Sequence, residues 1–280
     1  MTVNEIYQSG LKLLENNNIE NSKFEAQSLL QKAFSLDRVG FIIHKTDKAD
    51  ENCSHNFLNF IERRISGEPL QYILGEWSFM GFDFKVGRGV LIPRDDTEVV
   101  VNLCIDFLKN RADKKTVDLC SGSGAIAVAL DKISGAKVTA VEIDETAFSY
   151  LETNVKENNS SVKPVMADAL KICDTFADGG LDLIVSNPPY IKSADIETLQ
   201  KEVQLEPRLA LDGGEDGCDF YREIVSRWSR KLKKGGVLAF ELGEGQADAV
   251  KALMTDKGFS DFKISLDFGG VQRAIIGTLL

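Results

Sequence analysis

From about residue 112 onward, short apolar segments alternate with segments of helical periodicity. Such alternation is typical of a parallel sheet with helices on both faces. The last two apolar segments have no helix between them, so we expect them to pair antiparallel at one edge, through the turn at 268–270. The predicted strands are 116–119, 137–142, 162–166, 181–186, 236–241, 261–266 and 272–279. The sequence therefore predicts a seven-stranded α/β domain.

The tetrapeptide Asn187-Pro188-Pro189-Tyr190 directly follows the predicted buried strand 181–186. The prolines lack an N–H and make the turn stiff, so it continues neither a strand nor a helix. The side-chain oxygen of Asn187 and a proline carbonyl are two acceptors that suit both hydrogens of an –NH₂ group, and Tyr190 would form a flat apolar wall. We expect a site that orients a planar amide or aromatic amine without a general base. An ordinary surface turn is the alternative.

A glycine-rich loop, Cys120-Ser121-Gly122-Ser123-Gly124, connects the strand 116–119 to a predicted helix. The loop satisfies a dinucleotide-binding pattern, with Glu142 at the distance expected of a ribose-binding acid. Asp118 instead favours S-adenosylmethionine, because a carboxylate attracts the methionine ammonium and repels a pyrophosphate. Asp168, just after the third strand, is placed to accept from an adenine amino group. The alternative is that these three acids are exposed loop residues.

Residues 1 to about 75 are predicted to be helical. Ser22 and Glu25 form a capping-box pattern, and a further helix is expected to end near Gly67. The first of these helices would bury Ala26, Leu29, Leu30 and Ala33, and the second Phe57, Ile61 and Ile65. This region either covers the edge of the main domain or docks a substrate.

An alternating pattern on both sides of Met80-Gly81 predicts a β-hairpin. The predicted domains are 1–75 for the helical substrate-docking domain, 76–94 for the hairpin linker and 95–280 for the α/β domain. Arg94 precedes Asp95, Asp96 and Glu98, where a loop is expected to enter a helix. We expect Arg94 to form ion pairs with these acids; the alternative is a role in lining a pocket.

Composition excludes several classes of protein. The five cysteines include no Cys-x-x-Cys pair, and both histidines lie in the amino-terminal quarter, so neither a disulfide framework nor a metal site is predicted. A net charge of −10 argues against direct binding of nucleic acid. No apolar segment approaches the roughly 20 residues of a membrane span, and no signal-peptide pattern is present, so we expect a cytoplasmic protein without membrane contact. Without a heptad pattern we expect a monomer.

The sequence resembles the release factor glutamine N5-methyltransferases, the PrmC/HemK family, within the class I S-adenosylmethionine-dependent methyltransferases. The resemblance covers nearly the whole chain. Besides the glycine-rich loop, it rests on the segments 67–75 (GEPLQYILG), 91–94 (LIPR), 96–98 (DTE), 187–191 (NPPYI) and 206–214 (EPRLALDGG). The asparagine-proline turn alone is shared with adenine-N6 DNA methyltransferases, so the other segments make the resemblance specific.

The resemblance implies a Rossmann-like seven-stranded class I methyltransferase domain with a small amino-terminal helical domain joined by a β-hairpin. It also implies transfer of a methyl group from S-adenosylmethionine, leaving S-adenosylhomocysteine, to a glutamine in the Gly-Gly-Gln motif of peptide chain release factors. The site residues that it implies fall into two groups. Substrate binding and catalysis involve Asn187, Pro188, Pro189 and Tyr190, and cofactor binding involves Asp118, Cys120, Ser121, Gly122, Ser123, Gly124, Glu142, Asp168, Ala169 and Asn187.

Three residues depart from the family pattern. Cys120 stands where glycine is usual, Glu142 where aspartate is commoner, and Asp95 where proline is usual. None of them lies in the Asn187 turn.

Three other functions are considered. They are a glutamine methyltransferase of a ribosomal protein, an adenine-N6 methyltransferase of nucleic acid, and a non-catalytic cofactor-binding protein. The 96–98 and 206–214 segments favour the release factor branch. The negative charge argues against nucleic acid, and the intact turn argues against loss of catalysis.

Overall fold

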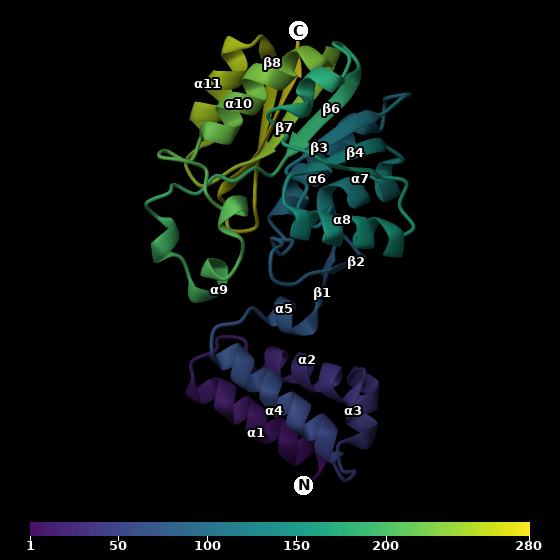
Figure 1. Ribbon diagram of the computed structural model, residues 1–280, viewed down its shortest axis with the longest axis vertical. Helices are drawn as coiled ribbons and strands as arrows, with labels where there is room; N and C mark the ends of the chain where they lie inside the picture. Colours follow the sequence, from purple (N-terminus) through teal and green to yellow (C-terminus); the bar gives the residue numbers. More distant parts are fainter. The chain divides into compact units, whose positions relative to one another are not determined.

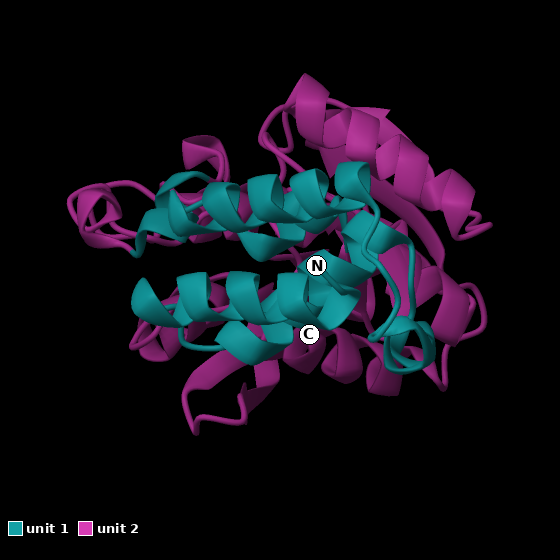
Figure 2. Ribbon diagram, turned by 90° about the horizontal axis from the view of Figure 1, so that it is seen from below, with its two compact units in different colours: residues 1–76, 200–205 teal, residues 77–199, 206–280 magenta.

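The computed structural model describes residues 1–280, which divide into two compact units (Figure 2). Unit 1 contains residues 1–76 and 200–205, and unit 2 contains residues 77–199 and 206–280. The chain therefore passes between the units three times. None of the helices combines the length and the apolar composition that would be needed to cross a membrane.

Unit 1 is a helical bundle. Leu14, Leu29, Leu30, Phe57 and Ile61 are completely buried where its three longest helices meet. The helices of the unit are α1 (Val3–Asn16), α2 (Ser22–Phe34), α3 (Arg38–His44), α4 (Glu51–Ile65), α5 (Leu70–Leu74) and the short α9 (Lys201–Gln204). Ala26, Leu29 and Leu30 of α2, and Phe57 and Ile61 of α4, are buried at helical spacing as predicted, whereas Ala33 and Ile65 are only partly buried.

The predicted capping box at the start of α2 is wrong. Ser22 is the first residue of the helix rather than its cap, and the Glu25 carboxylate turns inward to the guanidinium of Arg64, with 2.5 Å between Nε and Oε2. Burial of Arg64 requires a carboxylate partner, and this requirement outweighs capping. A capping box does occur at α1, where the Glu5 N–H donates to Thr2 Oγ1 (3.2 Å) and the Thr2 N–H donates to the Glu5 carboxylate (2.8 Å).

Arg64 also holds a segment from much later in the chain. Its guanidinium pairs with Glu202 of α9, with 2.5 Å between nitrogen and oxygen. The Arg64 side chain is only 5% exposed, whereas that of Glu202 is 41% exposed, so the pair lies at the surface above the buried guanidinium. Residues 200–205 are thereby bound to the helices of unit 1.

Unit 2 contains a seven-stranded sheet of the order β5-β4-β3-β6-β7-β9-β8 (Figure 1). All seven predicted strands are present, and β9 runs antiparallel to both of its neighbours. A two-stranded hairpin, β1 (Glu76–Phe79) and β2 (Phe82–Lys85), precedes the sheet as predicted. The strands of the sheet are β3 (Lys115–Leu119), β4 (Lys137–Glu142), β5 (Lys163–Met166), β6 (Leu181–Ser186), β7 (Leu232–Glu241), β8 (Phe259–Leu266) and β9 (Gln272–Leu279).

Helices cover both faces of the sheet (Figure 1). On one face, α6 (Thr97–Leu108), α7 (Ala125–Ser134) and α8 (Glu145–Glu157) enclose an apolar core; on the other, α10 (Asp219–Trp228) and α11 (Ala247–Asp256) enclose a second. Because β3, β4, β6 and β7 are buried on both faces, they read as continuous apolar segments. Four short 3₁₀ turns complete the unit: Ile172–Thr175, Ile196–Thr198, Arg208–Ala210 and Ser229–Lys231.

Candidate active site

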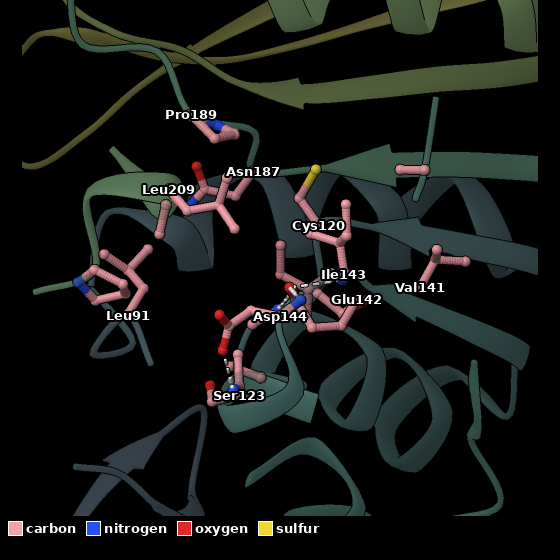
Figure 3. A pocket seen from close by; sticks show the side chains of 18 of the residues that line it. Leu91, Cys120, Ser123, Val141, Glu142, Ile143, Asp144, Asn187, Pro189 and Leu209 are labelled. Atoms are coloured by element: carbon pink, nitrogen blue, oxygen red, sulfur yellow. Dashed lines mark hydrogen bonds between the residues drawn. The ribbon is translucent and has the colours of Figure 1, made fainter. Parts of the chain in front are cut away.

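A cavity of about 260 Å³ lies in unit 2 at the carboxyl ends of β3, β4 and β6 (Figure 3). In the figure, Cys120 and Glu142 extend from strand ends, whereas Leu91 and Leu209 lie on the side of the cavity away from those strands. Of the predicted glycine-rich loop, Cys120, Ser121, Gly122 and Ser123 line the cavity and Gly124 does not. The rest of the lining comes from Gly89, 91–94, Thr97, 125–126, 141–144, Ala147, 167–170, Asn187, Pro189, Pro207, 209–210 and Phe220. The glycine-rich loop and the asparagine-proline turn, which are far apart in the sequence, therefore share one cavity.

The glycine-rich loop depends on left-handed backbone conformations. Gly122 and Gly124 have φ values of +54° and +83°, which glycine adopts without steric cost. Cys120 has a φ of +58°, where a side chain costs about 1 to 2 kcal/mol. The loop thus accommodates a cysteine at a position whose backbone suits the glycine that is usual in the family. Burial raises the pKa of the Cys120 thiol, and the nearby Glu142 carboxylate raises it further, so both effects favour the thiol over the thiolate.

Glu142 connects the loop to the end of β4. One carboxylate oxygen accepts from the Gly122 N–H (2.8 Å), and the other accepts from the N–H groups of Ile143 (2.8 Å) and Asp144 (2.9 Å). A carboxylate offers about four lone-pair positions, so about one remains for a further donor in the cavity. Glu142 therefore keeps the loop in place, and its expected contact with a ribose stays a prediction.

Asp118 does not line the cavity. Side chains alternate along a strand, and Asp118 is opposite Val185 in the register of β3 and β6, so it points toward α6 and α7. Its carboxylate is completely buried and neither oxygen has a hydrogen-bond partner. Burial raises the pKa of Asp118 to about 8, and the charge of Glu142 adds to this effect. The expected contact with a methionine ammonium stays a prediction.

Asp168 and Ala169 do line the cavity, just after β5. The Asp168 carboxylate accepts from the Leu170 N–H (2.8 Å) and pairs with Lys171 Nζ (2.9 Å). Burial disfavours its charge, but these two bonds outweigh burial and lower the pKa of Asp168. The Ala169 carbonyl accepts from the Trp228 indole N–H (2.9 Å), which fixes the segment against α10.

The asparagine-proline turn presents two of its four residues to the cavity, Asn187 and Pro189. The Asn187 Nδ2 donates to Thr97 Oγ1 at 3.4 Å. Tyr190 is outside the lining: its hydroxyl donates to the Glu241 carboxylate (3.3 Å) and its carbonyl accepts from Gln246 (2.9 Å). The proposed roles of the Pro188 carbonyl and the Tyr190 ring stay predictions.

The 206–214 segment packs against this turn. The Ile191 N–H donates to the Leu211 carbonyl (2.9 Å), and the Gly213 N–H donates to the Ile191 carbonyl (2.8 Å). A Cβ at Gly213 would lie 2.7 Å from the Tyr190 Cα and 2.8 Å from the Pro189 carbonyl oxygen, closer than such atoms approach. A glycine at position 213 is therefore required for the 206–214 segment to support the turn.

The predicted ion pairs of Arg94 with its acidic neighbours are wrong. Arg94 instead pairs with Glu206, 112 residues later in the chain, and Glu206 also accepts from the Ile92 N–H (3.0 Å). The alternative prediction, that Arg94 lines a pocket, was correct. This pair joins the two segments that form the wall of the cavity away from the strands.

Two functional candidates were missed by sequence reasoning, Thr97 and Glu241. Thr97 lines the cavity beside Asn187, and Glu241 ends β7 with a side chain that is buried in the protein. The available signal was weak: Glu241 is a charged residue at the carboxyl end of an apolar strand, the position that active sites occupy in such sheets.

The cavity fits S-adenosylmethionine. Glu142 and Asp168 offer carboxylates at the ends of two neighbouring strands, and Ile143, Leu170 and Phe220 offer apolar walls for a flat base. A Cβ at Gly122 would project into open space, so the loop backbone is exposed to a ligand. Polar groups for a ribose and an apolar slot for adenine are what an adenosyl group requires.

Comparison with known proteins agrees with this geometry. Residues 5–75 match the PrmC N-terminal domain, and residues 94–217 match the methyltransferase small domain. A methyltransferase structure from Pyrococcus furiosus has the same fold, with a TM-score of 0.54 at 23% identity over 72% of this chain and 90% of that one. The fold and the matched domains place the chain in the class I methyltransferases, a class of enzymes that uses S-adenosylmethionine.

The full-length comparisons are more specific. A release factor glutamine methyltransferase from Geobacter sulfurreducens is 40% identical over 93% of this chain and 91% of its own length. One from Clostridium acetobutylicum is 33% identical over 99% of this chain and 98% of its own length. The chain belongs to the release factor glutamine methyltransferase family.

Proposed function

We propose that this protein methylates the side-chain amide nitrogen, N5, of the glutamine in the Gly-Gly-Gln motif of peptide chain release factors. S-adenosylmethionine supplies an electrophilic methyl group on its sulfonium, and S-adenosylhomocysteine is the product. The observation that carries the proposal is that the Asn187 turn lines the same cavity as the glycine-rich loop, Glu142 and Asp168. A group that orients an amide thus lies beside groups that suit an adenosyl cofactor.

Different residues of the cavity are proposed to bind the cofactor and the substrate amide. Gly122, Ser123 and Glu142 hold the cofactor side, and Asp168 and Ala169 contact the base. Asn187 Oδ1 and the Pro188 carbonyl accept the two N–H groups of the substrate amide. Two acceptors off the amide plane favour a pyramidal nitrogen and aim its lone pair at the methyl group. Because these dipoles are fixed before the reaction, no general base is needed to raise the reactivity of the nitrogen.

Unit 1 is proposed to dock the release factor. Its match to the PrmC N-terminal domain supports this role. Helix α3 also carries an apolar surface, on which Val39, Ile42 and Ile43 are 61%, 58% and 64% exposed. Exposed apolar groups of this kind often mark sites of protein binding.

Docking is tested by the double variant Ile42→Asp/Ile43→Asp. We expect a higher KM for a whole release factor, with unchanged turnover of a short Gly-Gly-Gln peptide and unchanged cofactor affinity. An unchanged KM for the whole factor would remove α3 from the docking surface.

The function itself is tested by peptide mass spectrometry of a purified release factor after incubation with the protein and S-adenosylmethionine. We expect one added methyl group on the glutamine of the Gly-Gly-Gln segment, absent when Asn187→Ala is used. Methylation of ribosomal proteins or of adenine in nucleic acid, with an unmodified factor, would favour one of the other functions.

A further inference from the structure

Gln246 is the residue that precedes α11, yet its side chain makes no hydrogen bond to that helix. The residue at such a position is usually a short polar one, whose oxygen accepts from the N–H groups of the first turn. The side chain of Gln246 instead turns back toward the end of β7, where its Oε1 accepts from the Gly243 N–H (3.0 Å). Gln246 therefore makes a contact other than the one that would stabilise its own helix.

The other end of the Gln246 amide reaches the asparagine-proline turn. Its Nε2 donates to the Tyr190 carbonyl (2.9 Å) and to the Gly217 carbonyl (3.2 Å), and its Oε1 also accepts from the Tyr221 hydroxyl (3.3 Å). A glutamine amide has two donor and two acceptor positions, and all four are used here. Because a backbone N–H only donates and a backbone carbonyl only accepts, these partners allow a single orientation of the amide.

Two glycines leave room for the Gln246 amide. A Cβ at Gly243 would lie 2.6 Å from Gln246 Oε1. A Cβ at Gly217 would lie 2.6 Å from Gln246 Nε2 and 2.4 Å from the Tyr190 carbonyl oxygen. These distances are shorter than a Cβ tolerates, so a side chain at either position would displace the amide. The contact between Gln246 and the turn thus depends on two positions that have no side chain.

Tyr190 is the last residue of the turn, and Asn187 is the first. Asn187 directly follows β6, which the sheet holds in place by pairing with β3 and β7. The two prolines between Asn187 and Tyr190 have a fixed φ and no N–H, so this connection is stiff and cannot anchor itself as a donor. A shift of Tyr190 is therefore passed on to Asn187, because the prolines do not absorb it.

We propose that Gln246 is a positioning residue of the methyl transfer, which fixes the Asn187 turn through the Tyr190 carbonyl. This inference rests on the proposed function of Asn187. Gln246 is not part of the cavity lining, and in this scheme it touches neither substrate nor cofactor. Its contribution is to keep the acceptors of the turn where the substrate amide meets the methyl group, which is a gain in orientation.

Gln246→Met tests the inference kinetically, because it removes the donors and the acceptors and keeps the length of the side chain. It should lower kcat for the release factor by about tenfold to a hundredfold, the range that a misplacement of about 1 Å produces. The KM for the release factor and the affinity and stoichiometry of S-adenosylmethionine binding, measured by calorimetry, should stay within about twofold, since no binding group is lost. A wild-type kcat in Gln246→Met would overturn the proposal.

Two further variants separate positioning from stability. Gly243→Ala leaves every hydrogen-bonding group in place but pushes the Gln246 amide away, so it should lower kcat as well. Met254→Ala opens a cavity at a completely buried position further along α11, so it should lower the temperature of thermal unfolding without lowering kcat. A loss of kcat in Met254→Ala equal to that in Gln246→Met would make the effect one of stability and would overturn the positioning role.

A measurement without turnover tests the link between Gln246 and Asn187. The side-chain –NH₂ resonances of Asn187, assigned by their loss in Asn187→Ala, should shift in Gln246→Met and stay in place in Met254→Ala. Resonances that are unchanged in Gln246→Met would overturn the positioning role. A wild-type protein that leaves every release factor unmethylated, but whose Asn187 resonances respond to Gln246→Met, would contradict the proposed function and not this link.

Discussion

The Glu142 carboxylate accepts a hydrogen bond of 2.8 Å from the backbone N–H of Gly122. This bond joins the end of β4 to the middle of the glycine-rich loop, across the cavity floor. A side chain proposed to bind the ribose therefore also fixes the shape of the loop that contacts the rest of the cofactor. Loss of Glu142 removes both effects together.

Glu142→Ala should weaken the binding of S-adenosylmethionine about tenfold to a hundredfold, because a hydrogen bond to a charged group contributes about 1.5 to 3 kcal/mol. Isothermal titration calorimetry measures this directly. Glu145→Gln, at an exposed position in the first turn of α8, is a matched control with the same change of charge. Equal affinities in the Glu142→Ala and wild-type proteins would show that the loop keeps its shape by other contacts.

Asn187→Ala should lower kcat a few hundred-fold, because the loss of one preorganised hydrogen bond costs about 3 to 4 kcal/mol of barrier. Asn187 is proposed to act on the nitrogen in the transition state, so the KM for the release factor should change much less than kcat. Initial rates with labelled cofactor measure both constants. A variant with near-wild-type kcat would exclude Asn187 as the orienting group.

Gly213→Ala should reduce both stability and turnover. The new Cβ would collide with backbone atoms of Pro189 and Tyr190, and backbone yields less easily than a side chain, so we expect a cost of about 1 to 3 kcal/mol. Gly135→Ala is the comparison: it has a positive φ of +69° but open space around it, so it should cost stability without loss of kcat. Thermal unfolding and initial rates, measured together, separate the two effects.

Asp118 should make the free energy of unfolding depend on pH. Its pKa of about 8 in the folded protein is far above its ordinary value of 3.8, so the folded state keeps a proton that the unfolded state has lost. The stability therefore falls as pH rises from about 4 to about 8. Asp118→Asn should flatten this fall in urea unfolding at pH 5, 6.5 and 8. Parallel curves for the two proteins would mean that Asp118 is not protonated in the folded state.

The strands and the location of the site were predictable because their signals are local. The sequence of β6 is an apolar run that is followed by Asn187 and ended by Pro188. In open α/β sheets, ligands bind at the carboxyl ends of the parallel strands, so the residue that follows such a strand lies at the site. The glycine-rich loop is likewise recognisable from its strand, its glycines and the helix that follows. In both cases the sequence neighbours of a residue decide its conformation.

What could not be predicted depends on distant pairing. Arg94 has three acids beside it in the sequence, yet its partner Glu206 is 112 residues away. Glu25 fits a capping box but is drawn to Arg64, a buried cation on another helix. The orientation of Asp118 follows from the pleat of the sheet, so that being near the loop in sequence did not place its side chain in the cavity.

The chain's three crossings between its units have a genetic consequence. Unit 1 is completed by residues 200–205, which lie between the asparagine-proline turn and the 206–214 segment that supports it. No single cut in the gene separates the two units intact: a fragment without the first 76 residues keeps α9 but loses Arg64, the partner of Glu202. In such a fragment residues 200–205 would lose the helices of unit 1 against which they pack. Exchange of the helical unit between homologues therefore has to carry residues 200–205 with it to yield an active hybrid.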